Sequence, residues 1–517
     1  MSDRGMPSIS RRNFMTAGAA LVGAAGLGLG RARADAPKRG GRLRMGIAPG
    51  YTTNTLDPAL LFGTHIINVS FQLRNGLVEL APDGTLVPEL AESWEGDKTA
   101  TTWIFRLRKG VQFHNGKELT AEDVIASINH HRGPDSKSAA KAYVAQIAEM
   151  KADNPHTVVV RLTAGNVDFP YVLADYTMQI FPAGTTDFND GIGTGGYVLS
   201  ALEPGVRAFA TRNPNYFKSD RAHFDEVETL VMNDDSSRTN GLRAGVIDVM
   251  NRVDLKTLNL LSRVPGVQIA EVAGRKHATF PMLTDQAPFT DNDVRLALKY
   301  AIDRQQLLDV VLQGHGAIGN DQPIPKSARF FNTDLPQRGY DLDKAKFHIN
   351  KAGAAGTEFV LHTAEAAFPG AVDAAALYKE QAAKAGINIR IVREPNDGYS
   401  SNVWRKKSWC MNFWSGRATE DWMFSTAYAE NAPWNDTNWR NPRFNTLLNE
   451  ARVEFDEAKR RALYGEMQRL VNEGGGALIP LFLNDVMALS DKLRHGQLSP
   501  SWEFDGHKAA ERWWFET

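Results

Sequence analysis

Tryptophan is concentrated in one stretch of this 517-residue chain, where six of the 11 tryptophans lie between Trp404 and Trp439. Their neighbours are polar or turn-forming, such as Ser415-Gly416-Arg417, whereas a core segment would surround tryptophans with aliphatic residues. Flat indole faces beside a few polar groups are typical of a ligand cleft. The stretch predicts a binding surface in which about two of the six tryptophans reach a ligand, the others filling gaps between helices.

A glycine-rich stretch, Gly191 to Gly196, formally matches the GxGxxG pattern of dinucleotide sites. That pattern needs a strand before it and a helix after it, so that the helix N-terminus meets a pyrophosphate. Here an acidic segment precedes the glycines, and a strand-like run from Tyr197 to Ser200 follows them. We interpret the glycines as a turn that enters a strand, and we predict no cofactor.

Signals for metal binding and for nucleophilic catalysis are weak. The 12 histidines show no HExxH or carboxylate spacing, and no GxSxG motif is present. The single cysteine, Cys410, lies between Trp409 and Met411, which favours a buried apolar residue over a catalytic thiol. These patterns predict neither a metal site nor an enzyme.

The elements that must position these residues belong to a mixed α/β chain. Thr120 and Asp123 have capping-box spacing and predict the start of a helix. An apolar stripe predicts one long helix from about Asp291 to Gln313, with Gly314 at its end. Further helices are expected over 444–453 and 456–472, and strands over 102–107, 157–162 and 358–363.

The N-terminal residues have the pattern of an export signal. Ser10-Arg11-Arg12-Asn13-Phe14-Met15 precedes an uncharged run to Gly30, and Ala32-Arg33-Ala34 offers small residues at a cut. This pattern indicates a twin-arginine signal over residues 1–34. The alternative is a membrane anchor, but a span needs roughly 20 predominantly apolar residues, and this run is shorter and rich in glycine.

The composition of the chain after residue 34 is consistent with an exported protein that has no disulfide bond. Without the leader, 54 basic and 59 acidic side chains remain, a net charge of −5, and no basic face for nucleic acid stands out. A single cysteine allows no internal disulfide, and no cysteine near residue 34 can carry a lipid. We predict a freely diffusing periplasmic protein, a monomer, with two or more lobes.

Several segments, taken in order, resemble the family 5 solute-binding proteins of ABC importers, the peptide, oligopeptide and nickel-binding group. The match covers nearly all of the chain after the leader. Its blocks are 90–94, 103–117, 119–124, 193–197, 212–217, 241–248 and 288–304, and Tyr340-Asp341, Ala345, Ala352-Gly353 and 479–481 also fit.

The resemblance implies an α/β bilobal periplasmic binding protein, type II-like, with an extra inserted subdomain and a hinge. The first lobe would comprise 35–78, 180–283 and 485–517, with the inserted subdomain at 79–179 and the second lobe at 284–484. Ligand would bind between the lobes, which close over it by hinge bending.

The resemblance also indicates the ligand site. Peptide-binding members place an aspartate shortly after a tryptophan of the second lobe, where it pairs with the peptide's ammonium; this chain has Trp414-Ser415-Gly416-Arg417. We hypothesise that Arg417 binds an acidic group of the ligand while Trp414 packs on its body. Alternatively, Arg417 pairs with Glu420 or Asp421, two acids that could otherwise take an ammonium. The loop from Tyr51 to Asn54 is a weaker candidate.

The predicted function is that of an importer's periplasmic receptor, without a reaction of its own. It would deliver a small peptide or a peptide-like or carboxylate-bearing solute to the transmembrane subunits of an ABC permease. The twin-arginine translocase would be its partner during export. An opine, sugar or metal-chelate ligand is the alternative, and an exported hydrolase is the competing class.

Overall fold

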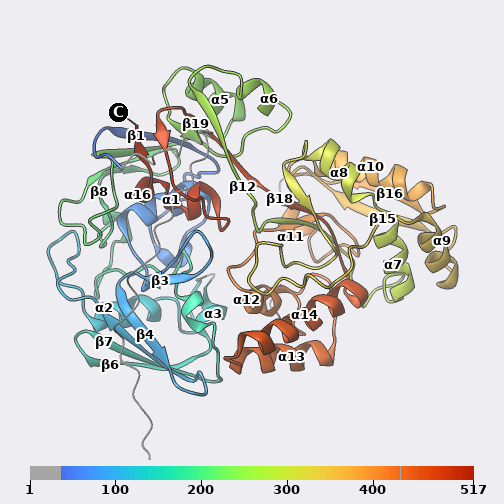
Figure 1. The fold of residues 1–517 in the computed structure, drawn as a ribbon, viewed down its shortest axis with the longest axis horizontal. Helices are drawn as coiled ribbons and strands as arrows, with labels where there is room; N and C mark the ends of the chain where they lie inside the picture. Colours follow the sequence, from blue (N-terminus) through green and yellow to red (C-terminus); the bar gives the residue numbers. More distant parts are fainter. Residues whose placement is uncertain (1–36, 139, 397, 431, 433, 517) are drawn as a thin grey trace, which may run out of the picture. The chain divides into compact units, whose positions relative to one another are not determined.

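The structure is a computed structural model that describes residues 37–516 except 139, 397, 431 and 433. The predicted export signal therefore lies outside the described residues. The described part is mixed α/β, as the sequence predicts (Figure 1). None of its helices combines the length and the apolarity needed to cross a membrane.

The first lobe is built on a seven-stranded sheet of order β12-β19-β11-β1-β10-β9-β8. The central strand β1 is parallel to β10 and β11, and β19 pairs antiparallel with β11 and β12. Alternating buried residues of these strands pack on the fully buried helix α1 (Thr64–Leu73). The strands are β1 (Arg42–Ile47), β8 (Tyr197–Glu203), β9 (Arg207–Arg212), β10 (Glu226–Val231), β11 (Val249–Met250), β12 (Val267–Val272) and β19 (Asp485–Ser490).

The glycine-rich turn enters β8, which confirms the prediction from the sequence. A Cβ atom on Gly193 would lie 2.1 Å from the carbonyl oxygen of Leu73, and one on Gly195 would lie 2.3 Å from that of Gln72. The glycines are thus required by close packing against the end of α1 rather than by a phosphate.

The inserted subdomain has its own antiparallel sheet, of order β4-β5-β7-β6, and its own hydrophobic core. Thr120 and Asp123 form the predicted capping box at the start of α2 (Ala121–Asn129). The sheet strands are β4 (Ala91–Gly96), β5 (Thr102–Leu107), β6 (Ile147–Asn154) and β7 (Thr157–Leu162), preceded by the hairpin β2 (Val78–Leu80) and β3 (Leu86–Pro88). Two short helices, α3 (Lys141–Val144) and α4 (Phe169–Val172), follow α2 in sequence.

The second lobe contains a four-stranded sheet of order β14-β18-β13-β17 and a parallel pair, β15 and β16. Its strands are β13 (His277–Pro281), β14 (Gly316–Ile318), β15 (Glu358–Thr363), β16 (Asn388–Arg393), β17 (Asn412–Trp414) and β18 (Ala477–Leu483). Its helices are α7 (Asn292–Tyr300), α8 (Arg304–Val311), α9 (Leu342–Lys351), α10 (Ala371–Ala383), α11 (Tyr399–Asn402), α12 (Glu420–Ala427), α13 (Pro442–Val453) and α14 (Glu457–Gly474).

The single helix predicted over 291–313 is wrong, because α7 and α8 are separate helices. Asp303 caps the second of them, accepting a hydrogen bond from the backbone N–H of Gln306 at 3.0 Å. An N-cap aspartate satisfies the free N–H groups of a new helix, which favours a break over a continuous helix.

The chain passes between the two lobes twice, from β12 to β13 through residues 273–276, and from β18 to β19 through Asn484. We call these the crossing segments; Figure 1 shows them joining the two parts. The domain boundaries given above stay a prediction, and β13, within the stretch assigned to the first lobe, pairs with β17 and β18 of the second.

The remaining short elements belong to the first lobe and its loops. They are η1 (Pro58–Leu60), η2 (Phe188–Asp190), α5 (Asp235–Arg243), α6 (Leu258–Leu261), β20 (Leu493–Arg494), α15 (Glu503–Gly506), α16 (Ala509–Arg512) and β21 (Trp514–Phe515).

Candidate functional site

The loop that carries Arg417 follows β17, an edge strand of the second lobe's sheet. Gly416 has a φ of +75°, and a Cβ there would lie 2.5 Å from Cβ of Arg275, so this position requires glycine. Arg275, in a crossing segment, donates from Nη1 to the carbonyl oxygens of Arg417 at 3.2 Å and Ala418 at 3.1 Å. The loop is thus fixed to a segment that joins the lobes.

The guanidinium of Arg417 lies among three indole rings. Its central carbon is 5.7 Å from the ring centres of Trp414 and Trp422 and 5.9 Å from that of Trp434, within the range of cation–π attraction. Nη1 donates to the carbonyl oxygen of Gly416 at 2.7 Å, and Nε is buried without a hydrogen-bond partner among the described residues. We call this group the arginine cage.

Within the described part of the chain, Arg417 has no ion-pair partner, and the two acids that follow it bind elsewhere. Glu420 accepts the backbone N–H of Phe330 at 2.8 Å, and Asp421 accepts Nε of Arg452 at 2.7 Å. Burial raises the pKa of both carboxyl groups. Both acids thus hold α12 to neighbouring segments, and their predicted role as an ammonium site stays untested.

A buried carboxylate positions two of the tryptophans. Asp436 accepts the indole N–H of Trp414 at 3.0 Å and that of Trp404 at 3.2 Å. Burial raises the pKa of Asp436 to about 6 although both indole hydrogen bonds lower it. Asp436 therefore fixes the orientation of Trp414, one of the three indoles of the arginine cage. Trp409 lies in one hydrophobic core of the lobe, and Trp439 shares a second core with Trp414.

The inserted subdomain contributes residues that the sequence analysis did not identify. Tyr143 of α3 makes an edge-to-face contact with Trp422, with ring centres 5.0 Å apart. Asp175 is buried, and burial raises its pKa although the charge of Arg417 acts in the opposite direction. No local pattern marks Tyr143 or Asp175, because their neighbours at the site come from the other lobe.

The loop after β1 is held by Asn54, which is buried. Its side-chain oxygen accepts the N–H of Tyr51 at 2.8 Å, and its amide donates to the carbonyl oxygen of Phe62 at 2.6 Å. The ring of Tyr51 stacks on Phe62 at 5.4 Å and is 38% exposed. Of these two residues, Tyr51 is accessible to solvent, whereas Asn54 is buried and stabilises the loop. Contact of either residue with a ligand stays a prediction.

A cavity of about 320 Å³ lies between the inserted subdomain and helices α12 and α13. It shares Tyr143 and Trp422 with the surroundings of the arginine cage. Its polar lining includes Gln146, Asn166 and Asp168 from the subdomain and Asp421, Ser425 and Arg452 from the second lobe.

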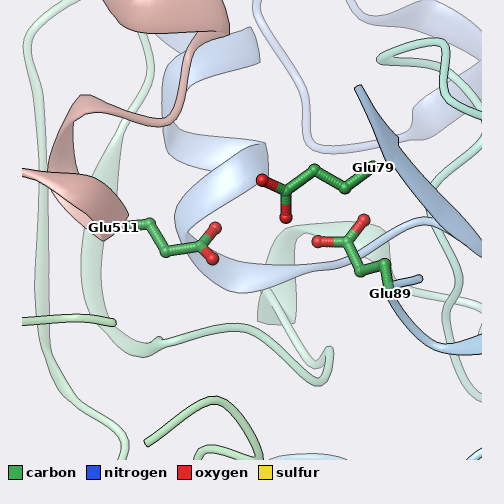
Figure 2. A group of neighbouring side chains, drawn as sticks. All are labelled: Glu79, Glu89 and Glu511. Carbon is green, nitrogen blue, oxygen red and sulfur yellow. The ribbon is translucent and has the colours of Figure 1, made fainter. Parts of the chain in front are cut away.

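Three buried glutamates, Glu79, Glu89 and Glu511, converge in the first lobe with carboxylate oxygens within 4.8 Å of one another (Figure 2). Such a group is a candidate cation site, yet protein cations already pair with it. Lys508 lies 2.6 Å from Glu89, Lys218 lies 2.5 Å from Glu79, and Arg512 contacts Glu79 at 2.6 Å. The acids form a compensated ion network, which we call the glutamate–lysine network.

Comparison with known proteins places this geometry in a family. The model of the bacterial extracellular solute-binding proteins, family 5 (middle), matches residues 85–436. The chain is 28% identical over 458 residues to di/tripeptide-binding protein 1 of Pseudomonas aeruginosa, covering 81% of this chain and 84% of that protein. It is 27% identical over 454 residues to heme-binding protein A of Haemophilus influenzae, covering 80% and 83%.

A solved structure extends the match to the fold. The binding protein AgaA of A. tumefaciens R10, in complex with agropinic acid, superposes with a TM-score of 0.79 at 23% identity, over 92% of this chain and 99% of that one. The α/β bilobal fold expected from the sequence is confirmed. With two lobes, an inserted subdomain and a family match over most of its length, this chain belongs to family 5 of the bacterial extracellular solute-binding proteins.

Proposed function

We propose that this protein is the periplasmic receptor of an ABC importer, which binds a small acidic solute between its lobes and delivers it to the permease. Family membership supports the receptor role. The observation that supports an acidic ligand is the position of Arg417. Its cation lies between three indoles and has no ion-pair partner among the described residues.

The physical basis is a guanidinium that is already oriented. Aromatic faces, the carbonyl oxygen of Gly416 and the hydroxyl of Ser415 hold the guanidinium of Arg417 in place, which lowers the entropy lost when it binds an anion. A planar guanidinium suits a carboxylate because it can donate two parallel hydrogen bonds. The ligand is therefore a carboxylate-bearing solute, such as a peptide-like compound or an opine; sugars and metal chelates are the alternative.

Closure explains how a receptor without chemistry of its own signals to a permease. A ligand that contacts both lobes favours the closed arrangement by the difference between its affinities for the closed and open forms. The closed lobes then present a combined surface that the open form lacks. A hydrolase would instead consume its ligand, so recovery of an unaltered ligand in fixed stoichiometry separates the two classes.

Replacing Arg417 with glutamine is expected to weaken binding of the natural ligand by about 10- to 100-fold, the value of a charge-assisted hydrogen bond. The ligand is identified by native mass spectrometry of the protein purified from its own periplasm, and affinities are measured by calorimetry. Arg440→Gln, at an exposed residue of the same lobe that is 3.7 Å from Glu430, serves as the control. Equal affinities of the two variants, with unchanged melting temperatures, would refute the role of Arg417.

We further infer that the protein is exported by the twin-arginine translocase, because of the Arg11-Arg12 pair and the uncharged run that follows. Replacing both arginines with lysine is expected to leave the protein in the cytoplasm, as measured by cell fractionation and immunoblotting. Arg4→Lys, in the same leader, is the matched control. Normal periplasmic levels of the double variant would exclude this route.

A further inference from the structure

Apart from the crossing segments, the second lobe contacts the inserted subdomain through a buried ion pair. Nη2 of Arg460, on α14, donates to the carboxylate of Asp168 at 2.5 Å. Both residues are almost inaccessible, with 2% and 5% of their surface exposed. The guanidinium carbon of Arg460 also lies 5.0 Å from the ring centre of Phe330. The guanidinium of Arg460 is therefore oriented by its own lobe, independently of its contact with Asp168.

Backbone contacts reinforce the ion pair. The N–H of Val167 donates to the carbonyl oxygen of Arg452 at 2.7 Å, which joins the subdomain to the end of α13. Beside it, a Cβ on Gly165 would lie 2.8 Å from Cγ1 of Val453. The same Cβ would lie 2.2 Å from the carbonyl oxygen of Thr99, so the subdomain's own backbone requires glycine at this point of contact with Val453. We call these contacts, between 165–168 and 452–460, the latch.

The latch is a localised contact rather than a continuous packed interface. The 320 Å³ cavity lies directly beside it, and Asn166, Asp168 and Arg452 line that cavity. Elsewhere the lobes meet in separate contacts, such as the Tyr143–Trp422 ring contact and the exposed Lys256–Asp373 pair at 3.1 Å. Interfaces of this kind separate more readily than a dense apolar core. The latch can therefore form and break while each lobe stays folded.

Opening the latch has a defined electrostatic consequence. A buried ion pair is favourable only in its matched geometry, and separating the partners returns both charges to water. The pair therefore selects one arrangement of the lobes instead of adding general attraction. Protein groups alone make both the ion pair and the backbone hydrogen bond, so the latch needs no ligand atom to form.

We propose that the latch, with Asp168 and Arg460 as its positioning residues, holds the lobes closed without ligand and thereby sets the apparent affinity. The proposal rests on the receptor function proposed above. The apparent dissociation constant of a two-state receptor is the intrinsic constant divided by the fraction of competent molecules. A latch that raises the closed fraction thus tightens binding without contacting the ligand, and slows entry of ligand through the open form.

The test measures the distance between the lobes in the ligand-free protein. Cysteines replace the exposed Lys109 of the subdomain and Lys379 of α10, and carry nitroxide labels for pulsed electron resonance. Cys410 is buried and burial raises the pKa of its thiol, so it does not compete for label. The wild type is expected to show mainly the short distance of the closed lobes. Asp168→Asn is expected to raise the ratio of open to closed molecules about tenfold.

Two further variants make the result decisive. Arg460→Lys keeps the charge but loses the fork of donors; it is expected to open the lobes as well, and it substitutes for Asp168→Asn if that variant does not fold. Glu466→Gln breaks the Arg443–Glu466 pair, which joins α13 to α14 inside the second lobe at 3.0 Å and does not bridge the lobes. It is expected to match the wild type.

Two results would overturn the latch: a wild type that is already open without ligand, or latch variants whose distances equal those of Glu466→Gln. Because no ligand is present, the outcome does not depend on the proposed ligand. A closed wild type that binds no acidic solute would refute the proposed function and leave the latch standing.

Discussion

Replacing Lys508 with methionine is expected to lower the free energy of unfolding by about 3–5 kcal/mol, the cost of breaking a buried ion network from one side. The ammonium group of Lys508 lies 2.6 Å from Glu89, 3.2 Å from Glu79 and 3.3 Å from Glu511, the three acids drawn in Figure 2. Methionine fills a similar volume but leaves these buried carboxylates with one positive charge fewer.

Denaturant unfolding at pH 7, followed by circular dichroism, measures this loss. Lys459→Met is the control, because Lys459 is exposed and its pair with Glu454, at 3.4 Å, lies at the surface. That variant is expected to change stability by less than about 0.5 kcal/mol. Similar values for the two variants would mean that the glutamate–lysine network contributes no more than a surface pair.

The network also predicts how this difference depends on pH. Burial alone would raise the pKa of Glu511, but Lys218 and Lys508 outweigh it and bring the pKa to about 2, below its ordinary value of 4.5. Between about pH 4.5 and about pH 2, the unfolded chain therefore binds more protons at Glu511 than the folded chain does. Glu511 contributes stability above this pH range, and that contribution is lost as the pH falls from about 4.5 through about 2. Without Lys508 that contribution shrinks, so the gap between variant and wild type is expected to narrow below pH 4.5.

Replacing Asp321 with asparagine is the second large prediction, with an expected loss of about 3–5 kcal/mol in the second lobe. Asp321 is fully buried and accepts from Arg304 at 2.7 Å and from Arg338 at 2.9 Å. It also accepts the backbone N–H of Ile479, in β18, at 3.0 Å. Asparagine keeps the shape but leaves two buried guanidinium groups without a counter-charge.

Hydrogen exchange read by mass spectrometry locates this loss. Faster exchange is expected in β18 and α8 of the second lobe for Asp321→Asn, and in β2 and β3 for Lys508→Met. Asp309→Asn, at an exposed position of α8 whose side chain accepts from Gln305 at 2.9 Å, is the control. Wild-type protection of β18 in the Asp321 variant would contradict the proposed role of this carboxylate.

Elements with contiguous signals were predictable from the sequence. The strands over 102–107, 157–162 and 358–363 occur as β5, β7 and β15, because their β-branched and aromatic residues are neighbours in the chain. The break at Asp303 also has a local cause, an N-cap. We did not predict it because apolar residues resume at Leu307, although the polar residues 303–306 interrupt the stripe.

The candidate site was less predictable, because its parts come from distant segments. Arg417 and its tryptophans share one stretch, so composition indicated them. Tyr143 and Arg275 reach the same place from the inserted subdomain and a crossing segment, and no periodicity relates them to residue 417. The glutamate–lysine network was unpredictable for the same reason, because Glu79 and Lys508 are 429 residues apart. In the sequence, each of them alone resembles a surface charge.

The contact between Glu79 and Lys508 has a consequence for folding during translation. Strand β19 separates β11 from β12, and Lys508 and Arg512 neutralise Glu79, so residues synthesised long after Glu79 complete the first lobe. Until residues 485–512 have been translated, the sheet lacks an inner strand, and Glu79 lacks Lys508 and Arg512 as counter-ions. The first lobe can therefore reach its final form only after residues 485–512 have been translated, and nascent chains that stall before residue 485 should be readily degraded by proteases.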